Sequence, residues 1–217
     1  MNEFSVDCRR CIRLAGFLDE VRAEYPDYHA RPVPPFGDAS PRLLIVGLAP
    51  GMHGANRSGR PFTGDHAGVL LYQTLYKFGF ADKPESKSAD DGLRLMGCRI
   101  TNAVKCLPPE NKPTGDEVKC CNGFLATEIS TLPKDAIVLA LGGIAHKAVL
   151  MATAKKIAGH KFVHGAKHRL ESGLTLFDSY HCSRYNTQTR RLTAAMFEQV
   201  FVDIRRFMEA HPPGNAR

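Results

Sequence analysis

A short apolar run, Leu43-Leu-Ile-Val46, is followed at once by a turn rich in glycine and proline, Gly47-Leu-Ala-Pro-Gly-Met-His53. Such a run is typical of a buried β-strand. The turn after it places backbone N–H groups and small residues at the carboxyl edge of a sheet, where open α/β folds bind their ligands. The turn matches neither GxxxxGK[ST] nor GxGxxG, so the sequence predicts a ligand other than a nucleotide phosphate at this edge.

Strands and helices alternate along the 217-residue chain, which is typical of a doubly wound α/β fold with a parallel sheet of about four strands. The length suits a single domain over residues 1–217 with a polar tail at 210–217. The sequence predicts helices at 4–24, 65–78, 114–131, 144–157 and 191–209, strands at 43–48, 98–104, 136–141 and 174–180, and a surface loop at 159–173.

Composition excludes several classes of protein. With 43% hydrophobic and 24% charged residues, the chain has the composition of an ordinary soluble globular protein. No run approaches the roughly 18 apolar residues of a membrane span. The first residues lack the basic and apolar segments of a signal peptide. We therefore expect a cytoplasmic protein without a membrane partner.

The net charge of +7 favours a polyanionic partner, because cationic side chains that neutralise phosphates release counterions. A mildly basic protein without such a partner is an equally good interpretation of the charge alone. Several basic residues, among them Arg60, Lys105 and Arg184, lie in predicted loops or beside the motifs. There a nucleic acid strand could reach them.

Seven cysteines in a cytoplasmic chain favour metal or redox chemistry over disulfides. Cys8 and Cys11 form a C-x2-C pair, Cys106 follows the second predicted strand, and Cys120 and Cys121 lie on the next helix. Four thiolates from these regions can hold a zinc ion or a 4Fe–4S cluster, and the spacing does not separate the two. Adjacent helical residues face different directions, so one of the last two is expected to be a ligand. Thiols that simply pack in the core are the alternative.

Four motifs occur in order along the chain: Gly47-Leu-Ala-Pro-Gly51, Arg60-Pro-Phe-Thr-Gly-Asp65, Thr101-Asn-Ala-Val-Lys-Cys-Leu-Pro-Pro-Glu-Asn-Lys-Pro113 and His181-x-Ser-x-x-Asn-x-x-Thr-x-x-Leu-Thr193. Together with the cysteine pattern they resemble the iron–sulfur uracil-DNA glycosylases, most closely the type-5 branch. The resemblance runs from residue 8 to about residue 193. It implies a three-layer αβα fold with a four-stranded parallel sheet.

The same resemblance implies a structural 4Fe–4S cluster held by Cys8, Cys11, Cys106 and Cys121. It also implies a monofunctional DNA glycosylase that excises uracil and starts base-excision repair. The expected partner is double-stranded DNA, with single-stranded DNA as an alternative, and the expected state is a monomer. A non-catalytic iron–sulfur module that binds nucleic acid on the same fold is the alternative function. A DNA cross-linking relative is disfavoured, because Arg57-Ser-Gly-Arg60 is too short for the basic insertion of such proteins.

Five residues are candidates for the base pocket. Phe62 suits a platform on which a flipped base stacks, although a core phenylalanine is an equal alternative. Asn102 offers an amide acceptor and two donors that fit the edge of uracil, and a cap or turn role is its alternative. The resemblance adds Gly47, Ala49 and Gly51. Since Gly51 stands where stricter enzymes carry a bulky ring, deaminated purines such as hypoxanthine are expected substrates as well.

Two residues are candidates for catalysis. His181 can hydrogen-bond the base oxygen that gains charge as the glycosidic bond breaks. Many uracil-DNA glycosylases place a carboxylate or amide in the first motif, but Leu48 and Ala49 stand there. The nearest alternative carboxylate is Asp65, which could orient water and stabilise positive charge at the sugar. The competing interpretation is that Asp65 caps the helix that starts beside it.

The last motif supplies the candidates for DNA contact. Ser183 and Asn186 are expected to hold flanking phosphates or to order the loop. Arg184 and Tyr185 are candidates for filling the space that a flipped nucleotide leaves, and exposed surface residues are the alternative. Cys182 replaces the proline of the usual His-Pro-Ser, which predicts a more mobile loop.

Overall fold

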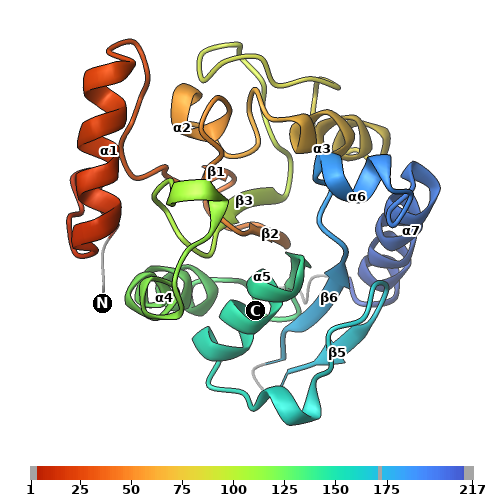
Figure 1. Cartoon of the computed structure of the whole chain (residues 1–217). Helices are drawn as coiled ribbons and strands as arrows, with labels where there is room; N and C mark the ends of the chain where they lie inside the picture. The colour runs from red at the N-terminus through yellow and green to blue at the C-terminus, as the bar shows by residue number, and fades with distance from the viewer. Residues whose placement is uncertain (1–3, 171–172, 213–217) are drawn as a thin grey trace.

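The computed structural model describes residues 4–170 and 173–212. No helix in this part of the chain is long and apolar enough to cross a membrane. Figure 1 shows the elements in chain order. They are α1 (Ile12–Glu24), β1 (Phe36–Gly37), β2 (Leu43–Gly47), α2 (Ala55–Ser58), α3 (His66–Lys77), β3 (Cys98–Asn102), η1 (Pro109–Asn111), α4 (Gly115–Ser130), β4 (Ile137–Leu141), α5 (Gly143–Ala152), η2 (Ile157–Gly159), β5 (Lys167–Arg169), β6 (Thr175–Ser179), α6 (Arg184–Gln188) and α7 (Ala194–Ala210).

Six strands form one sheet in the order β1-β3-β2-β4-β6-β5. The central strands β3, β2, β4 and β6 run parallel, so the four-stranded parallel sheet that was predicted is present. The sheet is larger than predicted, because β1 and β5 add an antiparallel strand at each edge. β5 lies within 159–173, which was predicted as a loop. The two edge strands have 2 and 3 residues, too few to display an alternating pattern.

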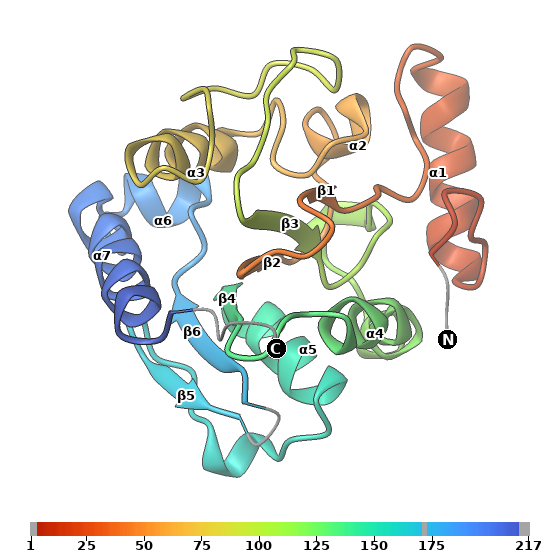
Figure 2. The same ribbon diagram turned by 180° about the vertical axis from the view of Figure 1, so that it is seen from behind.

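Helices cover both faces of this sheet (Figures 1 and 2). In β2, Leu44 and Val46 pack into a core that α1, α4 and α5 complete. Leu43 and Ile45 point to the opposite face and pack with α3 and α7. A strand buried on both faces has a continuous apolar sequence, which is why β2 could be predicted. The three-layer αβα architecture is confirmed.

The first helix is shorter than predicted. It begins at Ile12 rather than at residue 4, so Cys8 precedes it and Cys11 occupies its N-cap position. The amide of Cys8 donates to Ser5 O and the amide of Asp7 to Ser5 Oγ, which forms a turn in place of a helix. Most of the polar tail at 210–217 lies outside the described residues.

α4 begins with a capping box formed by Thr114 and Glu117. Thr114 Oγ1 accepts from the amide of Glu117 at 3.3 Å, and Glu117 Oε2 accepts from the amide of Thr114 at 2.7 Å. The same carboxylate receives Nη2 of Arg13 in α1 at 2.7 Å. The cap therefore also joins α1 to α4.

We expect Thr114→Ala to destabilise the fold by about 1 kcal/mol, because one N-terminal amide of α4 loses its acceptor. For a chain of this size that corresponds to a midpoint of thermal unfolding about 2–4 °C lower. The matched control is Ser130→Ala, which removes an exposed hydroxyl at the other end of α4. Equal shifts in the two variants would contradict the capping role.

Candidate active site

A cavity of about 520 Å³ opens at the carboxyl edge of the sheet. Its walls come from the turn after β2, the end of β3, the start of α3 and the segment after β6. Open α/β folds bind ligands at this edge. The predicted site residues that line the cavity are Ala49, Gly51, Phe62, Asp65, Asn102, His181, Ser183 and Arg184.

Gly47 does not line the cavity but makes room for two residues that do. It pairs in register with Asn102 on the neighbouring strand. A Cβ at Gly47 would lie 2.5 Å from Asn102 Oδ1 and 2.7 Å from the ring of Phe62. Only glycine therefore lets the amide and the ring approach each other here. Asn102 is buried, and its Oδ1 has no hydrogen-bond partner among the described residues, so this oxygen is an acceptor available to a ligand.

Phe62 and His181 form the aromatic wall of the cavity. Their ring centroids lie 5.8 Å apart with an interplanar angle of 28°. Phe62 has a φ of 57°, a left-handed conformation that is uncommon outside glycine. Its carbonyl oxygen occupies the space where a Cβ of Gly68 would stand. Phe62 therefore packs in the core beneath α3 and also presents its ring to the cavity.

His181 is a neutral side chain at physiological pH. Burial lowers the pKa of His181 to about 4. A neutral imidazole has one N–H donor and one acceptor. It can therefore donate a hydrogen bond to an oxygen in the cavity without carrying a charge.

Asp65 is the carboxylate of the cavity. Burial raises the pKa of Asp65, and the hydrogen bond from the amide of Ala55 lowers it in part. Oδ2 accepts from that amide at 3.1 Å. Asp65 stands at the N-cap position of α3 but makes no capping bond to that helix. Asp65 therefore does not form the capping bond of the competing interpretation, and its carboxylate instead accepts a hydrogen bond from the first amide of α2.

Two glycines make room for Asp65. A Cβ at Gly51 would lie 2.5 Å from Asp65 Oδ1. A Cβ at Gly54 would meet the same carboxylate still more closely. The absence of a side chain at Gly51 therefore leaves room for the carboxylate of Asp65 and also enlarges the cavity.

The segment after β6 forms a short helix, α6, which the sequence did not reveal because it has five residues. The hydroxyl of Ser183 accepts from the amide of Asn186 at 3.5 Å, and Nδ2 of Asn186 donates to the carbonyl of His181 at 2.8 Å. Both side chains order the segment that carries His181. Arg184 is exposed at the cavity, and Tyr185 is 69% exposed on the surface.

Two of the basic residues expected to be accessible are buried. Arg60 pairs with Asp91 at 2.7 Å, and Lys105 pairs with Glu128. The guanidinium of Arg60 and the ammonium of Lys105 are each paired with a carboxylate distant in sequence. Neither group is therefore free to contact a nucleic acid strand. Sequence reasoning could not find these pairs.

Two polar residues of the cavity, His66 and Asn111, had no role assigned to them from the sequence. His66 follows Asp65 directly, and its Nε2 lies 3.2 Å from Thr187 Oγ1 in α6. Asn111 lies in the proline-rich segment after β3 and has a φ of 57°. The available sequence signals were that His66 directly follows the second motif and that Asn111 lies within the third.

Five cysteines gather at a second, smaller cavity beside α1 and α4. They are Cys8, Cys11, Cys106, Cys120 and Cys121. Burial, followed by a hydrogen bond to Cys120, raises the pKa of Cys11 to about 12. Burial also raises the pKa of Cys106 and Cys121. Without a cation these thiols stay protonated, whereas a bound metal would hold them as thiolates.

A sequence model of the "Uracil DNA glycosylase superfamily" matches residues 34–205. The chain belongs to this family. A type-5 uracil-DNA glycosylase of Thermus thermophilus is 47% identical over 206 residues, which cover 92% of this chain and 93% of that protein. A type-5 uracil-DNA glycosylase of Pyrobaculum aerophilum is 42% identical over 199 residues, covering 90% and 86% of the two chains.

A solved structure has a similar fold. The crystal structure of Pedobacter heparinus SMUG2 covers 90% of this chain and 85% of that chain, with a TM-score of 0.50 and 16% identity. At this identity the likeness is one of fold. The family and the N-glycosyl hydrolase class that the motifs implied are thus confirmed by the family match and the type-5 relatives.

We expect His181 to make stability depend on pH. Its pKa is about 4 in the folded chain and 6.5 in an ordinary environment, so the unfolded chain binds more protons between these values. The contribution of His181 to the free energy of unfolding is complete above the pKa of the unfolded chain and is lost as pH falls toward the pKa of the folded chain. His181→Gln should therefore reduce the drop in the urea midpoint between about pH 7 and about pH 5. The control is His53→Gln, at an exposed residue, and an unchanged drop in His181→Gln would contradict the burial of a neutral imidazole.

Proposed function

We propose that the chain is a monofunctional DNA glycosylase that excises uracil and so starts base-excision repair. The observation that carries this proposal is the buried amide of Asn102, whose Oδ1 lacks a partner among the described residues at the wall of the cavity. Uracil presents a ring N–H beside a carbonyl oxygen. One amide oxygen and one amide N–H satisfy both groups together.

The other walls suit a base that has left the duplex. A glycosylase must extrude its target nucleotide to reach the bond it breaks. The ring of Phe62 provides a face on which the extruded base stacks. As the glycosidic bond breaks, negative charge grows on the base oxygens. The neutral imidazole of His181 is suited to donate a hydrogen bond to one of them, and this donor is already in place before the reaction.

Asp65 is the group proposed to act on water. Its carboxylate lies in the same cavity as Asn102 and His181, and burial raises its pKa. A carboxylate of higher pKa is a stronger base, so it can orient a water molecule and take up its proton as the water attacks the sugar. The negative charge also stabilises the positive charge that develops on the sugar.

The surface around the cavity suits a DNA strand. Arg184 is exposed at its rim and Tyr185 is exposed beside it on α6. We propose that these two side chains enter the space that an extruded nucleotide leaves. The net charge of +7 favours binding to phosphates. We propose double-stranded DNA as the main substrate, single-stranded DNA as a second one, and a monomer as the active form.

Deaminated purines such as hypoxanthine are proposed as further substrates. The cavity of about 520 Å³ lies within the range of small-molecule sites. Gly51 leaves its wall without a side chain that would exclude a larger base. The same residue must stay small for Asp65, so substitution at Gly51 is expected to reduce release of every base rather than of purines alone.

We further propose that the five-cysteine cavity holds a 4Fe–4S cluster, a group that is structural in this family. Thiols from the segment before α1, from the segment after β3 and from α4 meet at this one cavity, and cysteine thiolates are the ligands of such clusters. Cys8, Cys11, Cys106 and Cys121 are the proposed ligands. Cys121 Sγ also accepts from the amide of Lys105 at 3.3 Å, a contact common for cluster sulfurs.

Single-turnover base release from duplexes with one uracil or one hypoxanthine tests the enzymatic proposal. We expect release of both bases by the unmodified chain. Asp65→Ala and His181→Ala should each lower the rate by about 10²- to 10⁴-fold. Asp65→Ala removes the carboxylate that acts on water, and His181→Ala removes the hydrogen-bond donor to the leaving nucleobase. Asp203→Ala, which removes a half-exposed carboxylate of α7, is the control.

Each outcome of that experiment is informative. Release that survives in Asp65→Ala would leave a glycosylase in which another group positions the water. No release of either base, with tight duplex binding intact, would contradict the enzyme and favour a non-catalytic binding module. Release of uracil alone would remove the deaminated purines from the proposal.

Iron and acid-labile sulfide content test the cluster. We expect about four of each per chain. Cys106→Ala and Cys121→Ala should lose most of both, whereas Cys98→Ala removes a buried core thiol and should keep them. Cys120→Ala is the decisive neighbour control. Loss of iron in Cys120→Ala and its retention in Cys121→Ala would overturn the proposed ligand set.

A further inference from the structure

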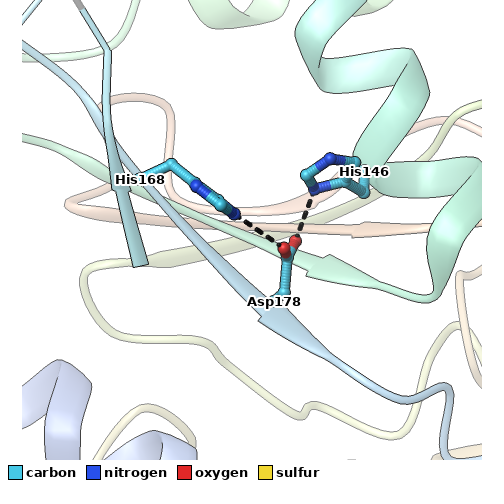
Figure 3. A group of neighbouring side chains, drawn as sticks. All are labelled: His146, His168 and Asp178. Carbon is cyan, nitrogen blue, oxygen red and sulfur yellow. Dashed lines mark hydrogen bonds and ion pairs between the residues drawn. The ribbon is translucent and has the colours of Figure 1, made fainter. Parts of the chain in front are cut away.

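Three ionisable side chains outside the active-site cavity meet beside β6 (Figure 3). His146 in α5 places Nδ1 at 2.8 Å from Asp178 Oδ1, and His168 in β5 places Nε2 at 3.2 Å from Asp178 Oδ2. The ligand atoms of the three residues all lie within 4.8 Å of one another. The side chains of His146 and Asp178 are 1% and 0% exposed, and that of His168 is 14% exposed.

The hydrogen bonds of His146 require a cation at this place. Its Nε2 lies 2.8 Å from the carbonyl oxygen of His160, which can only accept, so Nε2 carries a proton. Its Nδ1 faces a carboxylate oxygen, which also accepts. A neutral imidazole has a single N–H. Either a second proton or a metal ion must therefore lie between Nδ1 and Asp178.

The ligand chemistry favours a metal ion. Two imidazoles and one carboxylate are donors that zinc and related divalent ions prefer. A metal-bound histidine usually donates its other N–H to a carbonyl or carboxylate, as His146 does to His160 O. Within the described residues, the ion pairs of Asp178 are with histidines alone, so no permanent cation neutralises this buried carboxylate.

We propose that His146 Nδ1, His168 Nε2 and the carboxylate of Asp178 bind a divalent transition-metal ion of the zinc class. Ligand atoms on a tetrahedral zinc ion lie about 3.3 Å apart, so the two N···O contacts of 2.8 and 3.2 Å need to open only slightly, and the two nitrogens already lie within 4.8 Å of each other. These three side chains leave a fourth position on the ion to water.

The ion would have a structural role. It joins α5, β5 and β6, which come from separate parts of the chain. β6 ends at Ser179, directly after Asp178, and His181 at the active-site cavity follows two residues later. Holding Asp178 in place therefore holds the end of the strand that leads to this histidine. The site is independent of the cysteine cavity, which has different residues and different ligand atoms.

Metal analysis of the purified holoprotein tests this site. After equilibration with a zinc buffer, we expect about one zinc ion per chain in addition to iron. X-ray absorption at the zinc edge should show nitrogen and oxygen ligands at about 2.0–2.1 Å, whereas zinc held by cysteines would show sulfur at about 2.3 Å. His168→Ala should lower the zinc content by at least about tenfold, because one of three ligands is lost. His53→Ala, at an exposed histidine outside the cluster, should keep it.

Three results would overturn the proposal. No zinc in the unmodified chain would mean that a proton lies between His146 and Asp178. A sulfur shell would assign the zinc to the cysteines, and an unchanged zinc content in His168→Ala would assign it elsewhere. Should His168→Ala fail to fold, the zinc content and ligand shell of the unmodified chain decide the matter alone.

Discussion

The carboxylate of Asp65 lies in the space that two glycines of the turn after β2 leave empty, and the geometry of the cavity depends on this contact. A Cβ at Gly51 would stand 2.5 Å from Oδ1, and one at Gly54 closer still. The amide of Ala55 donates to Oδ2 at 3.1 Å. The turn and the start of α3 are thereby held together. Because this carboxylate is buried, its pKa is raised, which suits a group that takes up a proton.

The parallel sheet supplies the remaining groups. Register pairing sets Asn102 opposite Gly47, and the missing side chain of Gly47 lets the amide lie close to the ring of Phe62. β6 ends just before His181, which burial keeps neutral. The cavity thus combines one carboxylate, one unpartnered amide oxygen and one neutral imidazole. This is a small set of polar groups in one cavity, and each has a separate task in the reaction that we propose.

β2 and β4 could be predicted, because strands buried on both faces have continuous apolar sequences. β1, β5 and α6 could not, since each is too short to show a period. The sequence identified Asp65 as the nearest carboxylate, but its contact with Ala55 depends on how the turn after β2 folds back. The burial of Arg60 and Lys105 depends on acidic partners far along the chain. Such pairings leave no local pattern in a sequence.

The central claim is that base release depends on the position of the Asp65 carboxylate against Gly51 and Gly54. A double-mutant cycle on base release tests this claim most directly. Gly54→Ala displaces the carboxylate without removing it. We predict that this variant loses uracil release about as fully as Asp65→Ala. The double variant should be no slower than either one, because both changes remove the same interaction. Normal release by a folded Gly54→Ala, or losses that multiply in the double variant, would contradict the claim.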